Sequence, residues 1–146
     1  MDQELPKTKE VRFLIVDDDR VSIMALQRSL RKLRIVNELE IAKDGLEALS
    51  ILNASVEAEG RLLPYIVILD LNMPRMNGFE FLEKIRSDPM LNKLIIFVLT
   101  TSDTPRDVSS AYEKNVAGYI VKDNPKETLW QALEMINAYS RLVEMP

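Results

Sequence analysis

The chain has 146 residues, with 19 basic and 23 acidic side chains, a formal net charge of −4 at pH 7, and neither cysteine nor histidine. This length suits one domain with its own core, and the acidic balance argues against a broad nucleic-acid surface. The absence of cysteine excludes disulfides and thiol chemistry. The absence of histidine means that the chain lacks the commonest metal ligand and the commonest general base.

No export or membrane signal stands out in the sequence. Residues 1–10 are polar and charged, and they lack the apolar centre of a signal peptide. The longest apolar runs have about six residues, far fewer than the ~20 that cross a bilayer. We therefore expect a soluble cytoplasmic protein with no membrane partner.

Five short apolar runs predict β-strands. They lie at residues 11–16, 36–41, 65–69, 94–99 and 117–121. Most of them are nearly continuous in apolar residues, which indicates strands buried on both faces between two layers of helices. The second run alternates apolar and acidic residues, as an edge strand with one wet face does.

Helix starts are marked at four places by a capping residue followed three positions later by an acid. These pairs are Asp44/Glu47, Asn77/Glu80, Thr104/Asp107 and Asn124/Glu127. Pro105 and Pro125 then fall at the first helical position, where a missing N–H costs nothing. Apolar residues at helical spacing predict a further helix after the first strand. The stretch 53–64 either lengthens the second helix or forms a surface loop.

The alternation of strands and helices predicts an α/β fold, a flavodoxin-like doubly wound (βα)5 sandwich. Its five-stranded parallel sheet should follow the order 2-1-3-4-5, with the second strand at one edge. We expect residues 1–10 to form an N-terminal extension and residues 11–143 to form one domain. No output domain is expected, because the last predicted helix ends close to the final residue.

Acidic residues follow two neighbouring strands of the predicted sheet. Asp17, Asp18 and Asp19 come directly after the first strand, and Asp70 comes directly after the third. The carboxyl ends of such strands form the edge at which open α/β sheets bind ligands. Oxygen ligands without histidine or cysteine favour Mg²⁺ or Mn²⁺. Alternatively, the aspartate run is a solvated turn in which Asp19 or a neighbour caps the next helix.

Two further strand ends bring a hydroxyl and an ammonium group. Thr100 follows the fourth predicted strand, and Lys122 follows the fifth. Beside a carboxylate cluster, they would offer a phosphoryl group one hydrogen bond and one counter-charge. Taken singly, Thr100 is better explained as part of a strand-end turn, and Lys122 as a lysine that simply pairs with the acids. Four strand ends presenting Asp, Asp, Thr and Lys to one crevice favour the phosphoryl site.

Four segments give the chain a resemblance to a known family. They read Phe13-Leu-Ile-Val-Asp-Asp18, Leu69-Asp-Leu-Asn-Met-Pro74 followed by Gly78, Val98-Leu-Thr-Thr101 and Gly118-Tyr-Ile-Val-Lys122. In order and spacing they resemble the receiver domain of two-component response regulators, the CheY-like family, over residues 11–143. The resemblance is to the stand-alone type. The 53–64 connection and the Leu-Thr-Thr-Ser run are similar to the branch paired with bacterial phytochromes.

The resemblance implies that Asp70 is the phosphoacceptor and that Mg²⁺ is the cofactor. Asp18 and Asp70 would ligate the ion directly, Asp17 would act through water, and Asn72 would supply its backbone carbonyl. The phosphoryl group would come from a phosphohistidine on a sensor histidine kinase, of which a bacterial phytochrome is one kind. Phosphorylation-dependent protein binding would then carry the signal in a phosphorelay.

The resemblance also implies a switch. Thr100 matches the switch hydroxyl, Lys122 the phosphoryl-binding lysine, and Tyr119 the aromatic residue whose rotamer reports the active state. Family members usually have proline after this lysine, whereas Asp123 follows it here. A homodimer through the fourth helix, fifth strand and fifth helix rests on the resemblance alone. Trp130, on the last helix, is either exposed for a partner contact or partly buried at the helix edge.

Two other functions compete with the signalling phosphoacceptor. A phosphohydrolase or phosphotransferase with an aspartyl intermediate typically has a second acid two residues after the nucleophile, where this chain has Asn72. A receiver-shaped interaction scaffold that is never phosphorylated has no need of the combined Asp, Thr and Lys set. We therefore expect a signalling protein rather than an enzyme, with no nucleic-acid partner.

Overall fold

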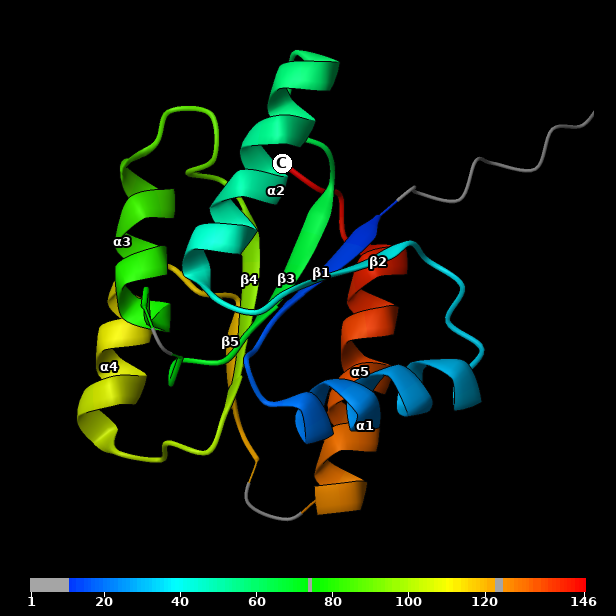
Figure 1. Cartoon of the computed structure of the whole chain (residues 1–146). Helices are drawn as coiled ribbons and strands as arrows, with labels where there is room; N and C mark the ends of the chain where they lie inside the picture. The colour runs from blue at the N-terminus through cyan, green and yellow to red at the C-terminus, as the bar shows by residue number, and fades with distance from the viewer. Residues whose placement is uncertain (1–10, 74, 123–124) are drawn as a thin grey trace, which may run out of the picture.

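The computed structural model describes residues 11–73, 75–122 and 125–146. Five strands alternate with five helices (Figure 1). The strands are β1 (Arg12–Val16), β2 (Leu39–Ala42), β3 (Tyr65–Leu69), β4 (Ile95–Thr100) and β5 (Gly118–Val121). The helices are α1 (Arg20–Lys32), α2 (Gly45–Glu59), α3 (Gly78–Ser87), α4 (Pro105–Glu113) and α5 (Pro125–Leu142).

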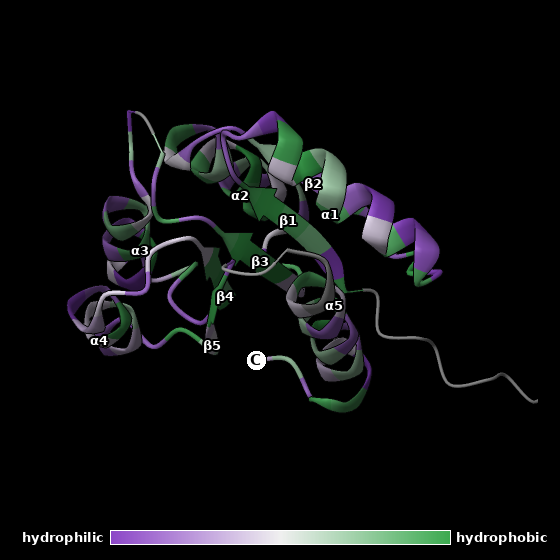
Figure 2. Ribbon diagram, turned by 90° about the horizontal axis from the view of Figure 1, so that it is seen from below, coloured by the Kyte–Doolittle hydropathy of each residue, from purple (hydrophilic) through white to green (hydrophobic). Residues whose placement is uncertain are grey.

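The strands form one parallel sheet in the order β2-β1-β3-β4-β5, which confirms the predicted topology. Helices α1 and α5 cover one face, and α2, α3 and α4 cover the other (Figures 1 and 2). Successive residues of β1 point to opposite faces, so Leu14 and Val16 join one core while Phe13 and Ile15 join the other. This two-sided burial is what the continuous apolar runs predicted.

The two edge strands differ from their predicted form. Strand β2 begins three residues later than the predicted run 36–41, and Val36 is 92% exposed. Pairing starts only where the Phe13 N–H donates to the Glu38 carbonyl oxygen, at 2.8 Å. All four residues of β5 are half-buried, because a strand at the sheet edge loses cover on its unpaired side.

The helix starts follow the predicted capping residues at three of four places. Asp44, Asn77 and Thr104 cap α2, α3 and α4 by accepting a backbone N–H bond three residues later. The predicted cap Asn124 lies outside the described residues. The stretch 53–64 mainly lengthens α2, which ends at Glu59 and is capped by Gly60 with a left-handed φ of 71°.

Among the helices that the structure describes, none combines the length and the apolar character that a membrane span requires.

Candidate functional site

Four strand ends converge at the carboxyl edge of the sheet. Asp17 follows β1, Asp70 follows β3, Thr100 ends β4, and Lys122 follows β5. Backbone bonds continue the sheet ladder through these positions: the Asp70 N–H donates to the Val16 carbonyl at 2.9 Å, and the Lys122 N–H donates to that of Thr100 at 2.7 Å. The backbones are therefore held in register with the sheet, and their side chains meet in one place.

The carboxylate of Asp70 is held by two donors on one oxygen. The Thr100 hydroxyl donates to Oδ1 at 2.8 Å, and the Asn72 backbone N–H donates to the same atom at 3.1 Å. The other oxygen, Oδ2, has the ammonium of Lys122 at 3.4 Å. The Asp70 side chain keeps 12% of its surface exposed, so a reactant can reach it.

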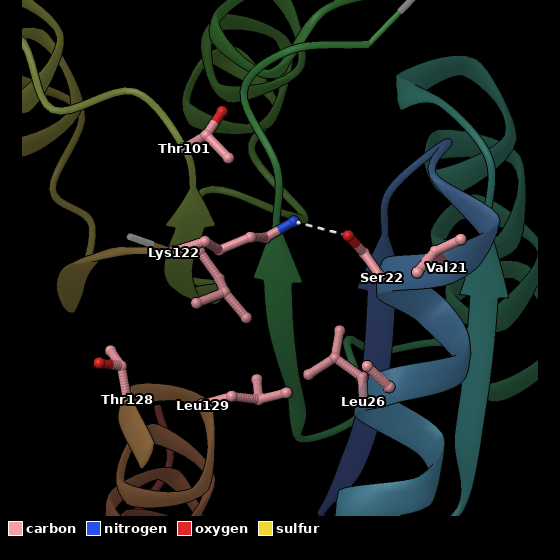
Figure 3. A pocket seen from close by; sticks show the side chains of 9 residues that line it. Val21, Ser22, Leu26, Thr101, Lys122, Thr128 and Leu129 are labelled. Carbon is pink, nitrogen blue, oxygen red and sulfur yellow. Dashed lines mark hydrogen bonds between the residues drawn. The ribbon is translucent and has the colours of Figure 1, made fainter. Parts of the chain in front are cut away.

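The ammonium group of Lys122 lies between several oxygen atoms. Its Nζ is 3.0 Å from Oδ2 of Asp17 and 3.4 Å from the hydroxyl oxygen of Ser22, at the start of α1. Figure 3 shows the side chain reaching towards Ser22 above the apolar side chains of Leu26 and Leu129. These apolar residues line a cavity of about 280 Å³ between α1 and α5, which Lys122 also lines. The lysine stem is thus packed while its charge faces the acids.

Asp17 is the most enclosed acid of the site, at 2% exposure. Burial raises the pKa of Asp17, because the charged form loses hydration. The Asp19 backbone N–H, which donates to Asp17 Oδ1 at 2.9 Å, and the nearby charge of Lys122 oppose that rise. Nearby Asp70 adds to it, since like charges disfavour each other. The positive charge of Lys122 therefore helps to keep the buried Asp17 ionised.

The carboxylates of Asp17, Asp18 and Asp70 form a group with metal-ligand spacing. One oxygen atom from each lies within 4.8 Å of the others. With all three carboxylates ionised, they and Lys122 together carry a net charge of −2, which a divalent cation would neutralise. An all-oxygen donor set of this kind suits Mg²⁺ or Mn²⁺. Asn72 is exposed beside this group.

The three consecutive aspartates have different surroundings. Asp17 and Asp18 belong to the carboxylate group, whereas Asp19 caps α1. Asp19 accepts bonds from the Ser22 hydroxyl at 2.8 Å and from the Val21 N–H at 3.1 Å, and these bonds lower its pKa. The capping interpretation therefore holds for Asp19 alone.

Ser22 is a site residue that the sequence interpretation missed. Its hydroxyl contacts both the capping carboxylate of Asp19 and the ammonium of Lys122. The available signal was its position three residues after a capping aspartate, where a hydroxyl can bond back to the cap.

Tyr119 does not touch the carboxylate group through its hydroxyl. Its phenol donates to the Ser102 carbonyl oxygen at 2.8 Å, on the connection between β4 and α4. The Ser102 hydroxyl in turn donates to Asp107 Oδ2 at 2.5 Å in the first turn of α4. Burial raises the pKa of Tyr119. The tyrosine therefore joins β5 to the start of α4.

A family model described as the response regulator receiver domain matches residues 13–134. The chain belongs to this family. Response regulator Rcp1 of Synechocystis sp. is 33% identical over 126 residues, which cover 86% of this chain and 86% of Rcp1. Chemotaxis protein CheY1 of Helicobacter pylori is 31% identical and is covered to 96%, again with 86% of this chain.

Solved structures of receiver proteins share the fold. The Mn²⁺-bound form of Rcp1 superposes with a TM-score of 0.78 at 32% identity, covering 92% of this chain and 98% of that one. The phosphorylated cyanobacterial phytochrome response regulator RcpA gives a TM-score of 0.80 at 29% identity, with 92% and 97% covered. The expected family and fold are thereby confirmed.

Proposed function

We propose that this response regulator accepts a phosphoryl group on Asp70 from a phosphohistidine of a sensor histidine kinase. The observation that carries the proposal is the contact set of Asp70: the Thr100 hydroxyl on one oxygen, Lys122 near the other, and two further carboxylates alongside. A carboxylate nucleophile, a donor, a counter-charge and a cation site are the parts that phosphoryl transfer needs.

The nucleophile is the less occupied oxygen of Asp70. Oδ1 already accepts bonds from Thr100 and Asn72, whereas Oδ2 has a contact of 3.4 Å with Lys122. Attack by Oδ2 on phosphorus forms the P–O bond while the P–N bond to the kinase histidine breaks. The bonding pair leaves with the imidazole nitrogen, so the products are an aspartyl phosphate and a free histidine.

Lys122 and Thr100 then stabilise the product. The new phosphoryl group carries more negative charge than the carboxylate did, so Lys122 turns from Asp17 towards it. The Thr100 hydroxyl donates to a phosphoryl oxygen instead of Asp70 Oδ1. Both movements are short, since each group already contacts Asp70.

Asp17, Asp18, Asp70 and the backbone carbonyl of Asn72 are the groups that would hold Mg²⁺. When bound, the ion would offset the charge that the phosphoryl group brings to the carboxylates. The supporting observation is the donor set itself, three carboxylates with oxygen atoms within 4.8 Å of each other. The similarity of this chain to the Mn²⁺-bound form of Rcp1 supports the same assignment.

The signal leaves the site through Thr100 and Tyr119. Movement of Thr100 vacates space that Tyr119 can enter after releasing the Ser102 carbonyl. Because Ser102 also bonds Asp107 of α4, this change alters the surface formed by α4, β5 and α5. We propose that partner binding, including homodimerisation through this surface, reads that change.

The kinase partner is proposed to be a bacterial phytochrome, because RcpA, to which this chain is similar, is a cyanobacterial phytochrome response regulator. Trp130 is partly buried. A fully exposed tryptophan would be stronger support for a partner contact at this position. The expected cytoplasmic location and the absence of a nucleic-acid partner stay predictions.

A receiver-like scaffold without phosphorylation is the competing function, and an aspartyl-phosphate phosphohydrolase is a weaker one. The names of the relatives describe regulators and a chemotaxis protein rather than enzymes. In addition, Asn72 occupies the position where a hydrolase of this kind would carry its second acid.

The test is the intact mass of the wild type and of Asp70→Asn after incubation with acetyl phosphate, with and without Mg²⁺. We expect the wild type to gain one phosphoryl group only when Mg²⁺ is present, and the variant to gain none. Absence of both phosphorylation and metal binding in the wild type would establish the scaffold instead.

A further inference from the structure

Arg75 has a backbone conformation that arginine rarely adopts. It lies in the connection between β3 and α3, five residues after Asp70, and its φ is 62°. The left-handed region is unfavourable for a residue with a Cβ atom, because Cβ comes too close to the following carbonyl oxygen. Such strain persists where surrounding contacts hold it, and it concentrates near functional sites. The contacts that hold Arg75 in this conformation are therefore candidates for a role at the site.

The guanidinium of Arg75 pairs with the carboxylate that caps α2. Its Nε donates to Oδ2 of Asp44 at 2.7 Å, and Nη2 pairs with the same oxygen. The other oxygen of Asp44 accepts the Glu47 N–H at 2.9 Å. Asp44 is 3% exposed, so its charge is enclosed between the helix terminus and the arginine. One carboxylate thus joins the N-terminus of α2 to the connection after β3.

The next residue strengthens this junction. The Gly45 N–H donates to the Met76 carbonyl at 3.3 Å. A Cβ atom at Gly45 would lie 2.7 Å from Cγ of Met76, closer than real contacts allow. The first turn of α2 and residues 75–76 are therefore in direct contact, with no room for a larger side chain between them.

The opposite end of the same connection touches the phosphoacceptor. The Asn72 N–H donates to Asp70 Oδ1 at 3.1 Å. The Gly78 N–H donates to the Leu71 carbonyl at 3.0 Å, and a Cβ atom at Gly78 would lie 2.8 Å from the Asp70 carbonyl oxygen. Asn72 and Gly78 therefore both lie against the backbone of residues 70–71, while residues 75–76 contact the first turn of α2.

We propose that Arg75, acting through Asp44, is a positioning residue for the phosphorylation site. The ion pair holds residues 75–76 against α2 and so keeps Asn72 beside Asp70, where its backbone carbonyl can face the metal. This inference rests on the proposed function, since it assigns Arg75 and Asp44 a part in forming the same site. It explains why an arginine occupies a strained position outside the carboxylate group.

Two substitutions remove the ion pair while they preserve the local backbone. In Asp44→Asn the side-chain carbonyl can still cap α2, whereas an NH2 group replaces the oxygen that accepts from Arg75. In Arg75→Asn the new residue tolerates the left-handed conformation. Glu83→Gln is the matched control, because it removes the ion pair between Glu83 on α3 and Lys114 directly after α4. Arg75→Lys restores the charge without the paired donors.

The first readout is the Mg²⁺ dissociation constant from calorimetric titration. We expect Asp44→Asn and Arg75→Asn each to weaken Mg²⁺ binding by about tenfold. This is the lower end of the loss in metal affinity that follows when a residue supporting the ligands is replaced. The double variant should bind no worse than the weaker single variant, because both changes remove one interaction. Arg75→Lys should recover part of the loss, and Glu83→Gln should bind as the wild type does. Wild-type affinity in both single variants would overturn the proposal.

The second readout needs no metal. The amide ¹H–¹⁵N chemical shifts of Asn72 report its bond to Asp70 Oδ1, and we expect them to change in Asp44→Asn and Arg75→Asn but not in Glu83→Gln. Unchanged shifts in both variants would show that the ion pair does not position Asn72. If the wild type binds no Mg²⁺ while the shifts do change, the positioning is supported and the proposed metal site is wrong.

Discussion

The ammonium of Lys122 lies 3.0 Å from Oδ2 of Asp17. This distance is shorter than the 3.4 Å to Asp70, although Asp70 is the proposed phosphoacceptor. In this state Lys122 mainly compensates the most buried acid of the site. Its transfer from Asp17 to a phosphoryl group is then a change of partner, for which the charge on phosphorus supplies the driving force.

Replacing Lys122 tests this relationship. Lys122→Met keeps the packing of the stem but leaves Asp17 buried without its counter-charge, so unfolding should require about 1–3 kcal/mol less free energy. Mg²⁺ should bind more tightly, because Lys122→Met removes a positive charge that lies beside the carboxylates and repels the ion. Urea unfolding and Mg²⁺ titration measure the two effects. Lys114→Met, which breaks a more exposed pair with Glu83, should cost at most about 1 kcal/mol. Equal losses in the two variants would contradict the role given to Lys122.

Mg²⁺ should stabilise the fold through the carboxylate group. At a free concentration 100 times the dissociation constant, binding to the native state alone adds about 2.7 kcal/mol to the free energy of unfolding. Asp18 is exposed, so Asp18→Asn should change metal-free stability by no more than about 0.5 kcal/mol while removing most of this gain. Urea unfolding of both proteins with and without Mg²⁺ decides the point. A full gain in Asp18→Asn would exclude Asp18 from the site.

Asp44 should make stability depend on acid pH. The bond from the Glu47 N–H, followed by the contacts of Arg75, lowers the pKa of Asp44 below its unfolded value of 3.8. A depressed carboxyl pKa contributes stability that is fully present above the unfolded value and is lost as pH falls through the folded value. Unfolding free energies measured from pH 5 downward should therefore fall less steeply in Asp44→Asn than in the wild type. Parallel curves would show that Asp44 titrates as it does in the unfolded chain.

Arg86 should be a large contributor to stability without a part in phosphorylation. Its guanidinium donates to the carbonyl oxygens of Lys114, Asn92, Leu94 and Asn115 at 2.7–3.1 Å, which joins the end of α3 to the segments before β4 and β5. Lysine cannot reproduce this fork, so Arg86→Lys should lower the unfolding free energy by about 2–3 kcal/mol.

The matched control for Arg86 is Arg12→Lys, because Arg12 forms a partly exposed pair with Glu38. Its effect on urea unfolding should stay within about 0.5 kcal/mol. Acetyl phosphate labelling should be unchanged in Arg86→Lys below its unfolding transition. A loss of labelling in the folded variant would connect Arg86 to the site.

Local signals in the sequence predicted most of the fold. Apolar runs of strand length and the caps Asp44, Asn77 and Thr104 depend on neighbouring residues alone, and the structure has the corresponding elements. The predicted start of β2 was wrong. The strand propensity of Val36 is a local property, and it does not show where pairing with β1 begins. Pairing begins at the Glu38 carbonyl, a property of the assembled sheet.

The sequence by itself determined the parallel order of the strands and the presence of Asp, Asp, Thr and Lys at four of their ends. Only the tertiary structure decided which contacts these groups make. Asp19 caps α1, and Lys122 lies nearest to Asp17. Arg75 pairs with Asp44, which is 31 residues earlier in the chain. The physical reason is range. Periodicity and capping act within a few residues, whereas the direction of a side chain at a strand end depends on turns and packing that distant segments create.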